Sequence, residues 1–207
     1  MKRTVKIFLM SLLCVVSLNH VLSAQNADAL VTKLANKYGS VPNYKLNIVY
    51  EANNEDMGFK NVQEGTLVVK GEKYILKYGP NETWLNDGKV EYVGTKEEDH
   101  SQILYFCPGK NTEAIVDYGN LLTFYAYEHK ATMDGNMIKL VPTSARPYTE
   151  LHLTVDGDNL TKISAVDSMG TVYTYSLSGF STSIGDPKFV INKWEYAETI
   201  DERKDCK

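Results

Sequence analysis

Apolar residues at every second position are the feature that most constrains the fold of this chain. Between Tyr44 and Tyr50, aromatic and aliphatic side chains alternate with others such as Lys45 and Asn47. A two-residue repeat is typical of a strand with one buried face. Similar patterns predict further strands over 62–70, 74–78, 83–85, 89–93, 128–133, 137–142, 150–155, 160–167 and 171–179.

Short turns separate these strands, among them Gly79-Pro80, Asp134-Gly135 and Met169-Gly170. Connections of this length force neighbouring strands to run antiparallel. The apolar spacing over 28–38 predicts one amphipathic helix, and the spacing over 111–127 predicts a second helical region. No linker or repeat divides the chain. We therefore expect one mainly β domain with helices (α+β) from 25 to 207, in which a single large curved antiparallel sheet carries helices against one face.

The first 24 residues have the pattern of a secretory signal peptide. Basic residues precede an apolar stretch over 7–18, and the segment ends at Ala24. The stretch is too short to span a membrane, so we predict cleavage after Ala24 and export of a soluble protein. An uncleaved anchor is the alternative. Cys14 follows Leu13, where lipoprotein processing needs a small residue, so we interpret it as ordinary signal sequence.

The charge balance argues against a nucleic-acid partner. Lys and Arg number 22 against 26 Asp and Glu, a net charge of -4, and loss of the three basic residues of the signal lowers it to about -7. No basic excess remains to meet a phosphate backbone. Cys107 and Cys206 are then left in a compartment where disulfides persist, and the sequence leaves open whether they pair.

The sequence has no catalytic or metal-binding motif, so we expect no enzyme activity, no cofactor and no metal site. After the signal, His100, His129 and His152 lack metal-ligand spacing. The Asx-Gly pairs at 134–136 and 156–159 are typical of hairpin turns rather than calcium loops. An all-β hydrolase with dispersed carboxylates stays the competing class.

The apolar strand positions allow two interpretations. In the first, they form the core under the helices. In the second, some of them line a cavity, because a curved sheet with two or three helices encloses more volume than the helices fill. The candidate ligand-binding positions are Leu30, Leu34, Tyr44, Leu46, Ile48, Leu67, Val69, Leu76, Trp84 and Tyr92.

The order and spacing of several motifs resemble the LolA family of periplasmic outer-membrane lipoprotein carriers. These motifs are the helix from Ala29-Leu30, the strand from Tyr44, the run Val62-Gln63-Glu64-Gly65-Thr66-Leu67-Val68-Val69-Lys70, then Asn86-Asp87-Gly88-Lys89, Ile138-Lys139-Leu140-Val141-Pro142, Ser164-Ala165-Val166-Asp167, Tyr175-Ser176-Leu177, Lys188-Phe189 and Asp201-Glu202-Arg203-Lys204. The resemblance covers nearly the whole mature chain.

The resemblance implies an unclosed antiparallel barrel with a helical lid, and we expect it to work as a monomer in the periplasm. Its cavity would accept the acyl chains of lipoproteins from an inner-membrane lipoprotein-releasing transporter and pass them to an outer-membrane acceptor. The positions that match the family's cavity lining are Leu34, Tyr44, Leu46, Ile48, Leu67 and Val69.

One segment departs from the family. The best-studied members have Lys-Arg-Pro after the second strand, with the arginine holding the lid shut, whereas this chain has Lys70-Gly71-Glu72. A lid without that arginine needs other restraints, and we predict a lid-contact region of Gly71, Tyr118, Leu122 and Tyr125. A periplasmic carrier of another lipid with the same fold is therefore the alternative to a lipoprotein carrier.

Overall fold

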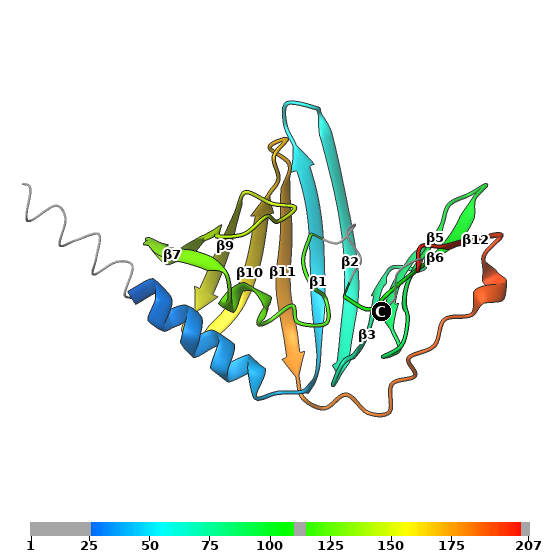
Figure 1. Ribbon diagram of the computed structural model, residues 1–207, viewed down its shortest axis with the longest axis horizontal. Helices are drawn as coiled ribbons and strands as arrows, with labels where there is room; N and C mark the ends of the chain where they lie inside the picture. Colours follow the sequence, from blue (N-terminus) through cyan, green and yellow to red (C-terminus); the bar gives the residue numbers. More distant parts are fainter. Residues whose placement is uncertain (1–25, 110–114, 204–207) are drawn as a thin grey trace, which may run out of the picture.

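One sheet of twelve strands makes up most of the protein (Figure 1). The computed structural model describes residues 26–109 and 115–203, and the predicted signal peptide lies outside them. The strands are β1 (Asn43–Asn54), β2 (Phe59–Lys70), β3 (Lys73–Tyr78), β4 (Glu82–Asn86), β5 (Glu91–Lys96), β6 (Ser101–Phe106), β7 (His129–Asp134), β8 (Met137–Pro142), β9 (Glu150–Asp156), β10 (Asn159–Val166), β11 (Val172–Ser181) and β12 (Glu198–Asp201).

The sheet is large, antiparallel and unclosed, which confirms the predicted fold class. Its order is β12-β6-β5-β4-β3-β2-β1-β11-β10-β9-β8-β7, with β12 and β7 at the two edges. All neighbours are antiparallel except β12, which pairs in parallel with β6. The prediction of about ten strands misses β6 and β12. The segment of β12 has no apolar alternation, and it becomes a strand because it pairs with the edge of β6.

A helix over residues 26–39 lies along the β7 to β10 side of the sheet (Figure 1). Its buried residues are Ala27, Val31, Leu34 and Tyr38, whose spacing of three and four places them on one stripe. Among the described residues, no helix combines the length and the hydropathy needed to cross a bilayer.

The helix is joined to the β9–β10 hairpin by polar contacts. The strand register of this hairpin is irregular between Leu160 and Lys162. At this irregularity, the backbone N–H of Leu160 donates to the Tyr38 hydroxyl at 3.0 Å. At the nearby turn, the ammonium of Lys33 pairs with Asp158. The Lys33 pair is exposed and contributes little, so the buried bond from Leu160 is the polar contact that matters most here.

The sheet buries side chains on both faces. The inner face is the one that carries Tyr44, Leu46 and Ile48, and it packs against the helix and residues 115–127 in one large cluster. The opposite, outer face carries a second cluster that includes Ile75 and Leu85.

The second predicted helical region is wrong for the described residues. Residues 110–114 of the predicted 111–127 lie outside the described part of the chain, and residues 115–123 form turns and bends. Only a single 3-10 turn, η1 (Phe124–Ala126), follows. The backbone N–H of Asn120 donates to Asp117, to its carboxylate at 3.1 Å and to its carbonyl at 3.2 Å, so the chain closes a tight turn here in place of a helical ladder. We call residues 115–127 the cover segment.

Residues 182–197, the C-terminal strap, cover the cluster on the outer face. The strap leaves the end of β11, passes the ends of β1 to β3 and continues through the 3-10 helix η2 (Lys193–Glu195) into β12 (Figure 1). Phe189, Ile191 and Tyr196 pack from the strap against the sheet. The sheet therefore has the helix and the cover segment on its inner face and the strap on its outer face.

The bond from Leu160 to Tyr38 predicts a measurable stability effect. Tyr38→Phe removes only the hydroxyl and leaves a buried N–H without its acceptor, which should lower the free energy of unfolding by about 1–3 kcal/mol. Urea unfolding measures the change. Tyr127→Phe, at a tyrosine that is 75% exposed, should leave the stability unchanged. Equal stability of Tyr38→Phe and the unmodified protein would contradict this role.

Candidate functional site

Nine of the ten candidate ligand-binding residues gather on the inner face. Leu30 packs at the edge of the large cluster, and eight others are buried within it. These eight are Leu34, Tyr44, Leu46, Ile48, Leu67, Val69, Leu76 and Trp84. They come from the helix and from β1 to β4, and none is more than 8% exposed. In this structure they form a packed surface beneath the cover segment.

Tyr92 is the exception, because it lies in the cluster on the outer face. In the β4–β5 ladder, Trp84 pairs with Val93 and Leu85 pairs with Tyr92. Residues paired across a ladder share a face, so Val93 holds the inner position next to Trp84. The sequence could not reveal this, because the connection between the strands leaves their register open by one residue.

The cover segment places its apolar side chains on the inner face. Tyr118, Leu122 and Tyr125 of the predicted lid-contact region are buried there, together with Leu121, which the sequence analysis did not single out. The ring of Tyr118 lies 5.2 Å from that of Trp84, centroid to centroid. The cover segment is therefore in direct contact with the candidate ligand-binding surface.

Further aromatic contacts surround Tyr118. Its ring centroid lies 6.3 Å from those of Tyr74 and Tyr175, and its hydroxyl lies 3.5 Å from that of Tyr78. Burial raises the pKa of Tyr118 and of Tyr175 well above the ordinary value. The tyrosine rings beneath the cover segment thus form an apolar interior, and their hydroxyls stay protonated and uncharged.

One hydroxyl of this interior has no partner. The Tyr125 side chain is fully buried, and its hydroxyl makes no hydrogen bond within the described part of the chain. Burial also raises the pKa of Tyr125. A buried hydroxyl without a partner costs about 1–3 kcal/mol of desolvation, so the packed arrangement of the cover segment is less stable than a fully paired one.

The end of the cover segment is fastened to the loop between β8 and β9. Glu128 has a backbone φ of 59°, a left-handed conformation that few residues other than glycine adopt. Its carbonyl accepts from Thr143 N at 2.7 Å, and its carboxylate accepts from Ser144 Oγ at 3.0 Å and pairs with Arg146. These contacts hold one end of the segment, while its middle is held by packing.

A cleft of about 820 Å³ opens between the cover segment and the β8–β9 loop. Its walls are mostly aromatic and aliphatic, with charged groups from Glu91, Asp117 and Arg146, a combination typical of small-molecule sites. The lining residues are Tyr74, Glu91, Gly109, Ile115, Val116, Asp117, Tyr118, Asn120, Thr123, Phe124, Tyr127, Ala145, Arg146, Pro147 and Tyr148.

A smaller cleft of about 260 Å³ adjoins it and contains Gly71. The two clefts share Tyr74 and Glu91, and the Tyr74 hydroxyl donates to the Glu91 carboxylate at 2.7 Å. Gly71 has a φ of 60° in the β2–β3 turn, with Asp117 of the cover segment across the cleft. A glycine with this backbone supplies the turn and has no side chain to reach the cover segment.

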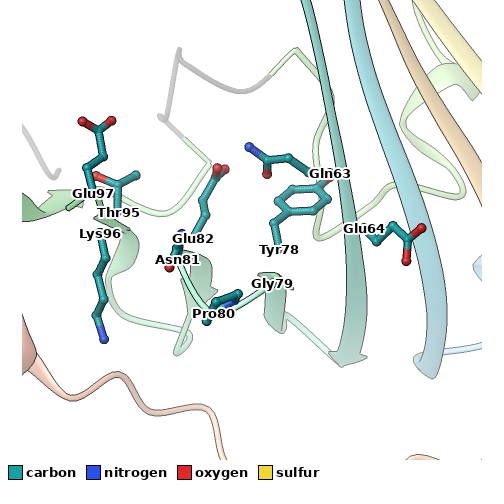
Figure 2. A pocket seen from close by; sticks show the side chains of 10 residues that line it. All are labelled: Gln63, Glu64, Tyr78, Gly79, Pro80, Asn81, Glu82, Thr95, Lys96 and Glu97. Atoms are coloured by element: carbon teal, nitrogen blue, oxygen red, sulfur yellow. The ribbon is translucent and has the colours of Figure 1, made fainter.

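A third cleft, of about 470 Å³, lies between the middle of β2, the β3–β4 turn and the end of β5 (Figure 2). It contains none of the candidate ligand-binding residues, and most of the residues that line it have polar side chains. The side-chain oxygen of Gln63 is buried there without a hydrogen-bond partner among the described residues. Tyr78 links this cleft to the interior, because its hydroxyl faces that of Tyr118.

Cys107 forms a disulfide. Cys206, the partner that the sequence leaves open, lies outside the described residues. Within residues 26–109 and 115–203, no group of three or more histidine, cysteine and acidic side chains is arranged to hold a metal ion.

The buried tyrosines predict a loss of stability in alkali. Burial, followed by the nearby Tyr173 and Glu82, raises the pKa of Tyr50 to about 12 from 10.0. Below pH 10 this contribution to stability is complete, and it is lost as the pH rises towards 12, because only the unfolded chain then releases the proton. Urea unfolding below pH 10 and at about pH 11 should show a smaller fall in stability for Tyr50→Phe than for the unmodified protein. Equal falls would contradict the raised pKa.

Comparison with known proteins yields likenesses in structure. No protein-family model matches the sequence, and no curated protein matches it. The chain is similar to a LolA superfamily protein from Nitrosomonas europaea, with 12% identity and a TM-score of 0.45 over 82% of this chain and 98% of that one. It is also similar to a DUF1329 family protein from Desulfovibrio piger, with 8% identity and a TM-score of 0.39 over 80% and 95% of the two chains.

A domain from Vibrio parahaemolyticus, assigned to the outer membrane lipoprotein-sorting proteins, is similar at 9% identity and a TM-score of 0.38, over 80% of this chain and 95% of that one. The similar structures thus include members of the family that the sequence resembles. Likenesses at these TM-scores do not establish a function for this chain.

Proposed function

We propose that the protein is a carrier that binds acyl chains on the inner face of its sheet, beneath the cover segment. The observation that carries the proposal is the irregular structure of the cover segment. A broad surface of apolar side chains is closed by a segment that has turns and one 3-10 turn in place of a regular helix. Segments of this kind open locally at a lower free energy than strands or helices do.

The unpaired hydroxyl of Tyr125 supports reversible opening. Displacement of the cover segment would return this hydroxyl to water and would expose the surface around Trp84 and Tyr175 to a ligand. The cleft between the segment and the β8–β9 loop offers a ligand a first contact before the segment is displaced. An extended acyl chain could then replace the side chains of Tyr118 and Leu121 against the sheet.

Competition between cover and ligand also accounts for release. At about 0.8 kcal/mol per buried CH2, a sixteen-carbon chain gains on the order of 12 kcal/mol on full burial, which would make its release slow. A cover segment that reburies its own apolar side chains offsets part of this gain. The empty, closed form is therefore what keeps binding reversible.

The cargo we propose is the acyl chain of a lipoprotein or of another lipid. The resemblance to the LolA family favours lipoprotein transfer in the periplasm, from an inner-membrane transporter to an outer-membrane acceptor. Gly71 stands where the family has its lid arginine, and the cover segment is held instead by packing and by Glu128 with Arg146. A carrier of another lipid is the second form of the same proposal.

A pair of neighbouring substitutions tests the inner face. Ile48→Glu places a carboxylate on the buried surface, at a cost of several kcal/mol unless it is protonated, and should weaken binding of a fluorescent fatty acid at least about tenfold. Val49→Glu, one residue away on the opposite side of β1 and 41% exposed, should leave the affinity unchanged. Circular dichroism checks that both variants fold.

The outcome that rejects the proposal is also defined. Undiminished binding by folded Ile48→Glu would place the ligand elsewhere. Native mass spectrometry of the unmodified protein, purified without detergent, gives a second answer that needs no variant. Repeated preparations without bound lipid that also fail to bind the fluorescent fatty acid would overturn the carrier function.

A substitution in the cover segment should change the stability of the protein and its affinity for the fatty acid in opposite directions. Tyr125→Phe removes the unpaired buried hydroxyl, so it should raise the free energy of unfolding by about 1 kcal/mol and lower the affinity for the fatty acid about fivefold. Titration calorimetry and urea unfolding measure the two effects. Tyr105→Phe, on the outer face, should leave the affinity unchanged. A Tyr125→Phe protein that binds more tightly would show that the segment does not compete with the ligand.

A further inference from the structure

Trp194 is the most exposed large apolar side chain among the described residues, with 96% of its surface open to solvent. It lies in η2 of the C-terminal strap, and Val190 of the same strap is 70% exposed. Tryptophan usually buries its ring, so an indole left wholly in water is a feature that folding does not explain.

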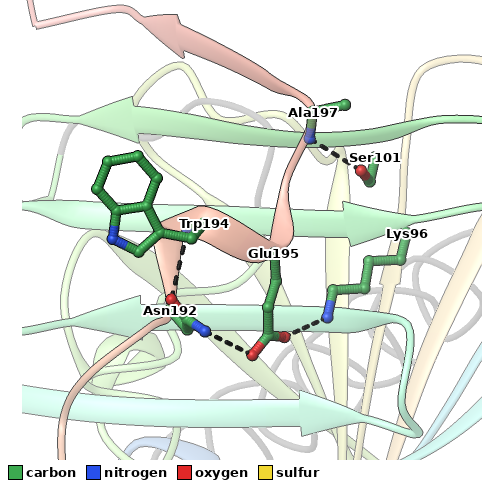
Figure 3. A network of polar contacts seen from close by, with 6 residues as sticks. All are labelled: Lys96, Ser101, Asn192, Trp194, Glu195 and Ala197. Atoms are coloured by element: carbon green, nitrogen blue, oxygen red, sulfur yellow. Dashed lines mark hydrogen bonds and ion pairs between the residues drawn. The ribbon is translucent and has the colours of Figure 1, made fainter.

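The backbone that carries Trp194 is firmly held (Figure 3). The Asn192 side chain accepts from Trp194 N at 3.3 Å and donates to the Glu195 carboxylate at 2.9 Å. Glu195 also pairs with Lys96 of β5, and Ala197 N donates to Ser101 Oγ at 3.0 Å. The indole therefore projects from a fixed position.

Close packing of the strap strengthens this point. Phe189, Ile191 and Tyr196 face the sheet in the outer cluster. At Gly94 the Tyr196 hydroxyl lies 2.3 Å from where a Cβ atom would stand, so only glycine admits this approach. The inward residues of the strap have a packing role, which leaves Val190 and Trp194 as the outward apolar pair.

Four lysines belong to the strap or to the outer face beneath it. Lys188 and Lys193 belong to the strap, and Lys73 and Lys77 stand on the outer face of β3, on either side of the buried Ile75. All four are exposed, and none has an ion pair in the described part of the chain. Of the two strap carboxylates, Glu195 pairs with Lys96, and Asp186 has no ion pair among the described residues. β3 and the strap thus carry four lysines against two carboxylates. The Lys193 ammonium lies over the rings of Tyr92 and Tyr105, 5.2 and 4.8 Å from their centroids.

We propose that this surface, formed by Val190, Trp194 and the four lysines, docks the protein on an anionic lipid bilayer. Indole rings prefer the boundary between headgroups and acyl chains, and lysines near the surface are attracted to anionic headgroups. The two kinds of side chain are presented together on one fixed segment. The inference goes beyond acyl binding, because the surface lies on the opposite face of the sheet from the cover segment.

The extent of the surface favours a bilayer over a protein partner. One tryptophan buries about 150–250 Å². A stable protein interface buries about 800 Å² on each partner, with a well-packed apolar centre. One indole and one valine fall short of that centre, but together with the lysines of the strap and β3 they match the combination of apolar anchor and basic charge that holds proteins on membranes.

Fluorescence gives a direct test, because the chain has only two tryptophans. Trp84 is buried and Trp194 is exposed, so Trp84→Phe leaves Trp194 as the reporter. Vesicles of phosphatidylcholine mixed with phosphatidylglycerol should shift its emission to the blue, and vesicles of phosphatidylcholine alone should not. Vesicle flotation of the otherwise unmodified protein gives the same answer without the Trp84 substitution.

Variants then assign the contacts. Trp194→Ala should lower partitioning onto anionic vesicles at least about tenfold. Lys188→Gln and Lys77→Gln should each lower it about fivefold and reduce its salt dependence. Met57→Ala, at a side chain that is 68% exposed in the β1–β2 turn, should leave it unchanged.

Several outcomes would overturn the inference. The first is that the protein binds neither kind of vesicle, and the second is that it binds both equally. The third is that Met57→Ala loses binding while Trp194→Ala binds as well as the unmodified protein. A blue shift that depends on protein concentration without vesicles would instead identify a second copy of the chain as the partner. Fatty-acid affinity is measured separately, so vesicle binding without acyl binding would reject the carrier function and leave the membrane surface in place.

Discussion

Burial of the inner face is the constraint on which the rest of the structure depends. An antiparallel sheet that does not close into a barrel cannot bury this face by its own curvature, so other segments must cover it. The helix covers part of it with a regular stripe that includes Leu34 and Tyr38. The cover segment completes the layer with irregular structure, and it buries the hydroxyl of Tyr125 without a partner.

The two halves of this layer have different physical properties. The helix is bonded to β10 through Tyr38, and its own backbone groups are paired within the helix. The cover segment has few backbone bonds of its own and is fastened at Glu128. Opening of the cover segment therefore breaks fewer bonds than removal of the helix would. In the proposed carrier, the surface around Trp84 is a core when it is covered and the ligand-binding surface when it is not.

The outer face is organised differently, because its cover is tightly fitted. The approach of Tyr196 to Gly94 and the pairing of β12 with β6 fix the strap on the sheet. A segment fixed in this way can present Trp194 to a surface without cost to its own packing. The protein thus has an irregular cover held mainly by packing on one face and a strap bonded to the sheet on the other.

The sequence by itself determined the antiparallel sheet, the helix and most of the inner surface, because a repeat of two or of 3.6 residues depends only on local geometry. The predicted second helix did not form, because the chain around Asp117 and Asn120 closes tight turns in place of a helical ladder. Tyr92 turned to the outer face because the pairing of Trp84 with Val93 sets the register, and only the assembled ladder decides that. The tertiary structure alone brought the cover segment onto the sheet and placed Trp194 in solvent, because both depend on contacts between residues far apart in the chain.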